Sequence, residues 1–189
     1  MSPSARPVEN VWKYPRPPAL QKTASRLRVI WVHPGGKETT VADTTQGYRV
    51  LETSHPPTYY FPPSSILSPM QLRSSSARRT YCEWKGTAAY HDLVGEEGKV
   101  LSKGRIWSYP DPTGGFREIK DFLCFYCSSR SDESTAGSWK CLVDEDVAAP
   151  QAGDFYGSWV TPEITGGEKG FKGGESGGMI LQGSSPAGY

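Results

Sequence analysis

Short stretches of alternating apolar and polar residues run along this chain, separated by residues that favour turns. Leu27 to His33 and Thr39 to Asp43 flank a Pro-Gly-Gly-Lys turn, which predicts a β-hairpin. Tyr48 to Thr53 predicts a third strand. Later segments show the same pattern: Thr80 to Trp84, Thr87 to Asp92, Arg105 to Tyr109, Asp121 to Cys127 and Ser138 to Val143. About eight short strands at this spacing predict an all-β protein, folded as a barrel-like or folded-over sheet.

One short helix is expected between Ser64 and Arg79, where Ile66, Met70 and Leu72 form a modest apolar face. The chain contains 21 glycines and 16 prolines, a composition that disfavours long helices and favours short strands joined by tight turns. At most one or two short helices are therefore predicted.

Composition divides the chain into three parts. Residues 1–25 are polar and proline-rich, and we expect an extended arm whose aromatic side chains dock on the body. Residues 26–147 contain the predicted strands and form the β domain. Residues 148–189 form a C-terminal extension that becomes rich in glycine, and we expect its end to be flexible.

Charge and hydropathy restrict the partners. The net charge is +1 and the basic residues are dispersed, so no nucleic acid or anionic membrane is expected to bind. The N-terminus shows no signal sequence, and the longest apolar run, Val29 to Val32, is too short to span a membrane. These features, with four cysteines that need not pair, predict a cytoplasmic protein with reduced thiols. A homodimer is left open.

Three ionisable residues are candidates for catalysis. Glu52 follows an apolar strand, where partial burial would suit it to exchange protons, and His55 lies three residues further on, before two prolines. Lys85 precedes Gly86, where the backbone can bulge, and its ammonium group would hold an anionic oxygen. The structural alternatives are an ion pair between Glu52 and Lys85 or Arg49, and a histidine that serves only the turn.

Aromatic residues cluster in the same segments and would form the flat walls of a site for a small aromatic or polyketide-like molecule. They would equally serve a β-sheet core. The candidates for substrate binding are Tyr59, Tyr60, Trp84, Tyr90, Trp107 and Tyr109.

No metal or cofactor is expected. Cys124 and Cys127 have the CxxC spacing, and Cys82 and Cys141 would complete a four-cysteine zinc site. In a strand, however, positions 124 and 127 point to opposite faces of the sheet, whereas a zinc knuckle needs a turn there. Separate buried thiols are the favoured interpretation.

Several motifs follow one another along the chain: Pro15-Arg16-Pro17-Pro18, Val50-Leu51-Glu52-Thr53, Pro56-Pro57-Thr58-Tyr59-Tyr60-Phe61-Pro62, Cys82-x-x-Lys85-Gly86-x-Ala88-x-Tyr90, Trp107-Ser108-Tyr109-Pro110 and Phe122-x-x-Phe125-Tyr126. Together they resemble domain of unknown function family 427 (DUF427), sometimes labelled a nucleotidyltransferase-type family. The resemblance covers about residues 11 to 143, and the Gly153 to Trp159 segment resembles an extension of fungal members.

The resemblance implies a compact all-β fold of the β-tent type and no established activity. Nucleotidyl transfer is not expected, because it needs paired carboxylates holding magnesium beside a phosphate cradle, and the sequence shows neither pattern. The leading hypothesis is a cofactor-independent enzyme that moves protons on a small molecule, as an isomerase, cyclase or dehydratase does. The alternative is a noncatalytic module that binds a ligand or a protein.

Overall fold

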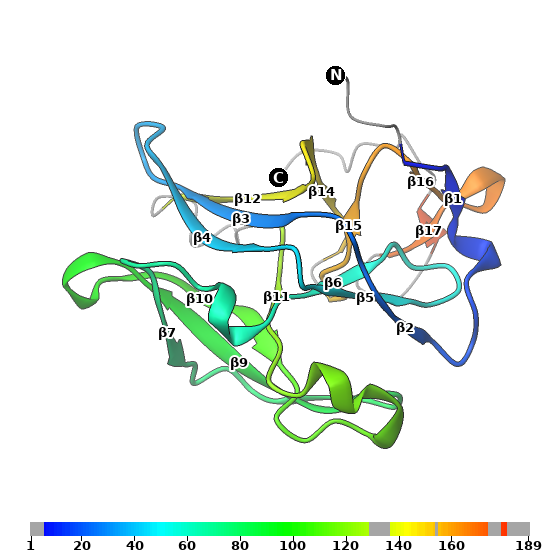
Figure 1. Cartoon of the computed structure of the whole chain (residues 1–189), viewed down its shortest axis with the longest axis horizontal. Coiled ribbons are helices and arrows are strands. Elements are labelled where there is room, and N and C mark those ends of the chain that lie inside the picture. Colours follow the sequence, from blue (N-terminus) through cyan, green and yellow to red (C-terminus); the bar gives the residue numbers. More distant parts are fainter. Residues whose placement is uncertain (1–5, 129–136, 154, 174–178, 181–189) are drawn as a thin grey trace.

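The computed structural model describes residues 6–128, 137–153, 155–173 and 179–180, and it confirms the all-β class. The strands form several small sheets (Figure 1), which do not close into a barrel within the described residues. The first sheet contains four strands, in the order β13-β12-β3-β4, and includes the predicted hairpin. Its strands are β3 (Leu27–Val32), β4 (Glu38–Thr44), β12 (Ser138–Val143) and β13 (Asp146–Val147).

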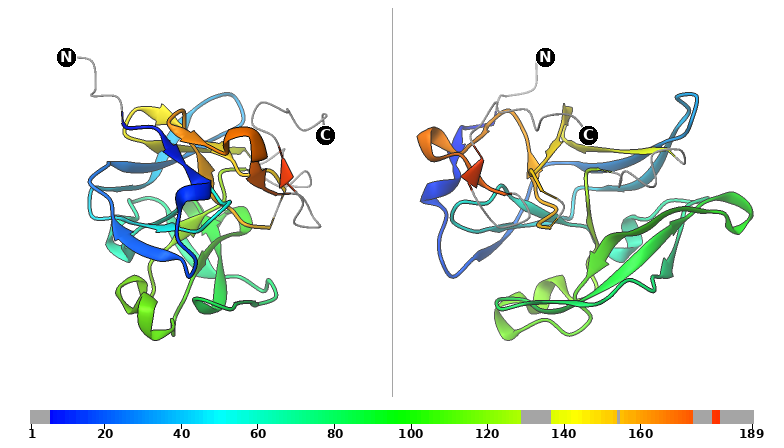
Figure 2. Two further views of the ribbon diagram at one scale, coloured as in Figure 1. Left: turned by 90° about the vertical axis from the view of Figure 1, so that its right-hand side faces the viewer. Right: turned by 180° about the vertical axis from the view of Figure 1, so that it is seen from behind.

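The second sheet is built on the long hairpin of β9 and β10, and β7, β8 and β11 pair with its edges. It lies opposite the first sheet in two views of the molecule (Figures 1 and 2). Its strands are β7 (Gln71–Ser74), β8 (Thr80–Cys82), β9 (Gly86–Val94), β10 (Val100–Ser108) and β11 (Cys124–Phe125).

The third sheet has three strands, and short strand pairs complete the fold. It consists of β2 (Ala19–Lys22), β5 (Tyr48–Leu51) and β6 (Thr58–Tyr60). The pairs are β1 (Glu9–Asn10) with β16 (Ile164–Thr165), β14 (Ala149–Pro150) with β15 (Trp159–Val160), and β17 (Phe171–Lys172) with β18 (Met179–Ile180).

Helical structure in the described residues consists of short 3₁₀ segments, none of which is long and apolar enough to cross a membrane. They are η1 (Val11–Lys13), η2 (Pro63–Ser65), η3 (Glu96–Gly98), η4 (Gly114–Ile119) and η6 (Gly167–Lys169).

The prediction of a helix between Ser64 and Arg79 was wrong. Only the 3₁₀ turn η2 lies there, and the chain then extends into β7, where Leu72 pairs with Leu93 of β9. Pro69 explains the difference, because a proline inside a helix removes a backbone hydrogen bond and clashes with the preceding turn. The apolar residues that suggested a helix pack on the core from turn and strand conformations instead.

Along β6, β10 and β11, residues that are neighbours in the sequence belong to two separate hydrophobic cores. Tyr59, Ile106 and Phe125 belong to the first core, between the first and second sheets. Their chain neighbours belong to the second core, on the other side of the same strands: Tyr60, Trp107 and Cys124. Successive side chains of a strand point to opposite faces, so strands covered on both sides must be apolar throughout.

The N-terminal arm and the C-terminal extension pack together (Figure 1), with β1 parallel to β16. They share a third apolar cluster that contains Val11, Tyr14, Ile164 and Phe171. Residues 166–173 of the glycine-rich segment therefore form part of the body, through η6 and β17. The expected flexibility of the end falls on positions 174–178 and 181–189, outside the described residues, and stays a prediction.

Arg6 ties the arm to the body through ionic hydrogen bonds. Its guanidinium donates to Glu163 Oε1 at 2.5 Å, to Asp144 Oδ2 at 2.6 Å and to Asp146 Oδ2 at 2.6 Å. Burial alone would disfavour the ionised form of Glu163, but the bonds from Arg6 outweigh it and hold the pKa of that carboxyl below its usual value. The arm is thus fastened at a half-buried ion cluster.

Replacing Arg6 with alanine should cost about 2 kcal/mol of unfolding free energy, because it leaves the largely buried Glu163 carboxylate without its cation. Urea unfolding measures this loss. Arg26→Ala is the matched control: Arg26 also pairs with an aspartate, Asp43, but its side chain is half exposed, so the loss should be much smaller than in Arg6→Ala. Equal losses in the two variants would show that the cluster does not anchor the arm.

Candidate functional site

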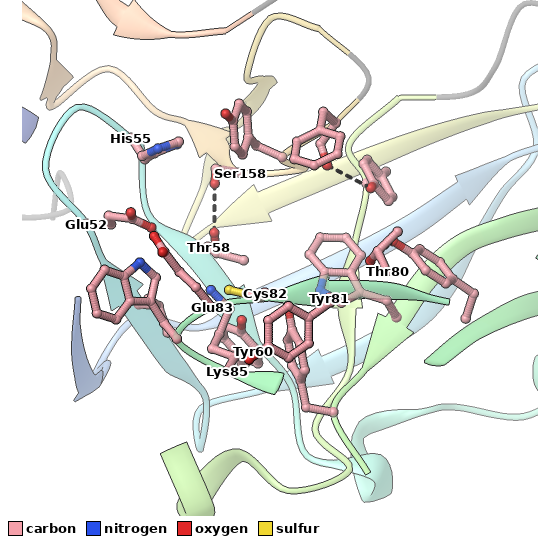
Figure 3. A pocket seen from close by; sticks show the side chains of 18 of the residues that line it. Glu52, His55, Thr58, Tyr60, Thr80, Tyr81, Cys82, Glu83, Lys85 and Ser158 are labelled. Atoms are coloured by element: carbon pink, nitrogen blue, oxygen red, sulfur yellow. Dashed lines mark hydrogen bonds between the residues drawn. The ribbon is translucent and has the colours of Figure 1, made fainter. Parts of the chain in front are cut away.

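A cavity of about 500 Å³ lies against the second core, within the size range of small-molecule sites. Its lining comes from Arg16 of the N-terminal arm, from β5, β6 and the turn between them, and from the segment from Ala77 through β8 to Lys85. Strands β9 and β10 with Tyr109 beyond them, Tyr126 after β11, and the C-terminal extension complete it. Figure 3 shows labelled side chains of the β5–β6 region, of the segment around β8 and of the C-terminal extension around one space. Tyr81 and Phe155, exposed by 74% and 65%, border it where it opens to solvent.

The cavity brings together the three catalytic candidates and most of the aromatic ones. Around it lie Glu52, His55, Lys85, Tyr60, Trp84, Tyr90, Trp107 and Tyr109. The segments 52–60, 82–90 and 105–109, which are far apart in the sequence, therefore meet at one site.

Tyr59 is the exception and corrects the prediction, because it does not line the cavity. It points into the first core, where it is 3% exposed and its ring centroid lies 5.2 Å from that of Trp159. Tyr59 and Tyr60 are neighbours in β6, so their side chains leave the strand on opposite faces, and only Tyr60 can face the site.

The turn that carries Glu52 and His55 is held from both ends of the chain. The amide of His55 donates to the Glu52 carbonyl at 3.0 Å, which closes the turn. Ser54 within it has a φ of 72°, which is unusual for a residue other than glycine. Its amide donates to the Val11 carbonyl at 3.1 Å, and its carbonyl accepts from the Lys172 amide at 2.8 Å. The surrounding structure thus maintains a strained backbone beside the cavity.

His55 is a buried, neutral imidazole with a defined tautomer. Burial, and then the positive charges of Lys172, Lys85 and Arg16, lower the pKa of His55 to about 4. The amide nitrogen of Gln151 donates to the Lys172 carbonyl, which fixes the orientation of that amide, and it also donates to His55 Nδ1 at 3.2 Å. Because Nδ1 accepts, the ring proton is on Nε2. His55 is therefore a hydrogen-bond donor at neutral pH, through a nitrogen that has no partner in the described part of the chain.

Glu52 is bound to Arg16 of the N-terminal arm, and not to Lys85 or Arg49. Arg16 Nη1 donates to Glu52 Oε1 at 3.3 Å, while Arg16 Nη2 donates to Glu83 Oε1 at 3.1 Å. Arg49 pairs with Glu9 instead. Among the described residues, no hydrogen bond occupies the second carboxylate oxygen of Glu52, so that oxygen is open to a ligand.

Lys85 presents a buried cation to the cavity. Lys85 is 9% exposed, and its ammonium nitrogen lies 5.8 Å from the centre of the Tyr109 ring and 5.9 Å from that of Phe116. No carboxylate pairs with it in the parts of the chain that the structure describes. Its carbonyl accepts from the Thr113 amide at 3.2 Å, and Gly86 behind it has a φ of 98°. The turn therefore fixes the position of the lysine, and glycine permits the turn.

The deeper wall of the cavity is neutral and aromatic. Burial raises the pKa of Tyr60, of Tyr109 and of the Cys124 thiol, so all three keep their protons at neutral pH. Tyr126 packs on Trp107, with ring centroids 4.7 Å apart. The tyrosines can offer surface and hydroxyl groups to a ligand, but they are not poised as bases.

Four residues that border or support the site had no distinctive signal in the sequence. Arg16, Ser158 and Lys172 line the cavity, and Gln151 orients His55. Ser158 exchanges a 2.7 Å hydrogen bond with Thr58 of β6 (Figure 3). Three of the four lie in the C-terminal extension, and only their long-range contacts place them here. Arg16 had one weak signal, since it is the single charged residue in its proline-rich motif.

The cysteines do not converge. Cys124 belongs to the second core, against which Cys82 packs, whereas Cys127 and Cys141 lie together in the first. Within the described ranges, no cluster of three or more histidine, cysteine, aspartate or glutamate side chains is placed to hold a metal ion.

The model of a protein family described as a domain of unknown function (DUF427) matches residues 19–137. The comparison with curated proteins finds no match. The matched segment contains Glu52, His55 and Lys85, and it ends before the extension that completes the cavity. Because it spans more than half of the sequence, the chain belongs to the DUF427 family.

Proposed function

We propose that this chain is a cytoplasmic, cofactor-independent enzyme that moves a proton on a small molecule held in the cavity, in an isomerase, cyclase or dehydratase type of reaction. One observation carries the proposal: a carboxylate, a neutral histidine donor and a buried lysine border the same aromatic-lined space. Groups with different proton affinities around one substrate are what general acid–base chemistry requires.

The residues take distinct roles in this proposal. The free carboxylate oxygen of Glu52 accepts a proton from a carbon next to a carbonyl, and the electron pair of the broken C–H bond moves to the carbonyl oxygen as an enolate. His55 Nε2–H and the Lys85 ammonium stabilise that oxygen. Glu52 then returns the proton to carbon, which balances the step without an oxidant or a cofactor. A dehydration would begin with the same abstraction and then lose hydroxide.

The experiment follows exchange of acidic C–H protons for deuterium by NMR in D₂O. The panel is phenylpyruvate, 2-oxoglutarate, acetoacetate and acetophenone. We expect the wild-type protein to accelerate exchange of at least one compound, and Glu52→Gln to slow it by about 100-fold, the usual contribution of a general base.

Glu83→Gln is the matched control, because it removes another carboxylate that binds Arg16 without touching the proposed base. It should keep the exchange rate within about threefold of wild type, since an exposed ion pair contributes little. An unchanged rate in Glu52→Gln would remove Glu52 from the mechanism.

The second candidate is a noncatalytic module that binds a ligand or a protein. The ion pair between Glu52 and Arg16 favours this noncatalytic module, because the pair gives the Glu52 carboxylate a structural role. Binding of a panel compound without any exchange would support this module over the enzyme.

A further inference from the structure

The charge lining the cavity is unbalanced in a way that identifies a class of ligand. Apart from Arg105, whose guanidinium is held by Ser128, four basic side chains border it, from Arg16, Arg78, Lys85 and Lys172. The described lining includes two carboxylates, Glu52 and Glu83, and both bind Arg16. The excess of positive charge is therefore a property of the cavity, although the chain as a whole is almost neutral.

Lys85 places one of these positive charges beside the aromatic rings of Tyr109 and Phe116. A buried ammonium group without a carboxylate partner is costly unless something compensates its charge. The rings of Tyr109 and Phe116 compensate it in part, at centroid distances near the limit for a cation–π contact. A ligand anion would complete the compensation, and it would be desolvated beside Lys85, where its attraction is strongest.

The remaining walls favour a flat ligand. Nine of the lining residues are aromatic, and they include the exposed Tyr81 and Phe155 at the mouth. Aromatic rings bind planar, conjugated groups by stacking and edge contacts. His55 Nε2–H adds one neutral donor for a further oxygen.

We propose that the ligand of this cavity is a planar aromatic acid, whose carboxylate pairs with Lys85 and whose conjugated body lies between the tyrosine and tryptophan side chains. The proposal names the substrate class of the proton-transfer site and rests on that site for its functional meaning. A phosphate ester of an aromatic alcohol offers the same anionic chemistry, and the experiment separates the two.

The test is calorimetric titration with probes that contain no ketone, so none of their C–H protons is acidic enough to exchange at an appreciable rate and binding is measured apart from catalysis. Cinnamate should bind the wild-type protein at least about tenfold more tightly than cinnamyl alcohol, which lacks the charge, and than acetate, which lacks the ring. Tighter binding of phenyl phosphate than of cinnamate would assign the site to phosphate esters and overturn the carboxylate.

Variants at position 85 test whether Lys85 causes the preference for cinnamate over cinnamyl alcohol. Lys85→Met keeps the length of the side chain and should weaken cinnamate binding at least about tenfold, while leaving cinnamyl alcohol unchanged. Lys85→Arg should retain most of the affinity, which keeps the test valid if the methionine variant folds poorly. Lys169→Met is the control, because Lys169 also lies over an aromatic ring, that of Trp12, but outside the cavity.

Two results would overturn the inference: equal affinities for cinnamate and cinnamyl alcohol, or an unchanged cinnamate affinity in Lys85→Met. Either can occur while deuterium exchange proceeds normally, which would leave the enzyme proposal standing with a different substrate. Tight, lysine-dependent cinnamate binding in a protein that exchanges no protons would instead support the ligand class and contradict the enzyme.

Discussion

Replacing Trp159 with alanine should lower the free energy of unfolding by about 3 to 5 kcal/mol, the usual cost of removing a buried large aromatic side chain. Trp159 is 1% exposed and packs against Tyr59 and Phe61, with centroid distances of 5.2 and 5.8 Å. Its indole nitrogen donates to the Phe125 carbonyl at 2.8 Å. The residue lies beyond the segment that matches the family, so the result would show that the extension is part of the folding unit.

Two further variants separate packing from hydrogen bonding and control for position. Trp159→Phe keeps much of the ring but loses the donor, and should cost about 1 to 2 kcal/mol. Phe155→Ala, in the same segment but 65% exposed, should stay within about 0.5 kcal/mol of wild type. Denaturant unfolding gives all three values. A Trp159→Ala protein as stable as Phe155→Ala would mean that the extension does not anchor in the first core.

Acidification should destabilise the protein through His55. The pKa of His55 is about 4 in the folded state and about 6.5 in an unfolded chain, so between these values the unfolded state binds more protons. The stabilisation is complete above pH 6.5 and is lost as the pH falls towards 4. The loss from this one residue amounts to about 3 kcal/mol, at about 1.4 kcal/mol per pKa unit.

His55→Gln isolates the effect, because glutamine does not titrate while the other groups of the protein stay the same. The stability of wild type relative to the variant should fall by about 3 kcal/mol between pH 7 and pH 4. Urea unfolding at several pH values measures the difference, and NMR of the histidine ring shows whether Nε2 carries the proton. A pH-independent difference would show that His55 titrates normally and is not a buried neutral donor.

The strands and the composition of the site were predictable because both are local. The hairpin around residues 34–37 follows from alternation and turn residues. The mixture of ionisable and aromatic residues at 52–60, 82–90 and 105–109 drew attention to three segments that line one cavity, and the use of that cavity as a ligand site is our proposal. Tyr59 was misassigned because the sequence shows two adjacent tyrosines but not the register that decides which one faces the site. In β6, Tyr60 does.

The partners of the catalytic candidates depend on contacts between distant parts of the chain. The structural alternative for Glu52 was an ion pair with Lys85 or Arg49, whereas the N-terminal arm supplies Arg16. Gln151, which sets the tautomer of His55, is 96 residues away from that histidine, and the Lys172 carbonyl that orients Gln151 is 21 residues away from Gln151. No local pattern contains such pairings, because they result from packing of the arm and the extension on the body.

The central claim is that Glu52 moves a proton in a cavity that binds its substrate by other groups. The most direct test measures, on the same samples of wild type and Glu52→Gln, the dissociation constant of phenylpyruvate and the exchange rate of its benzylic protons in D₂O. The account predicts dissociation constants within about threefold of each other and an exchange rate about 100-fold lower in the variant. Binding of phenylpyruvate by both proteins, with no exchange above the buffer rate in either, would contradict it.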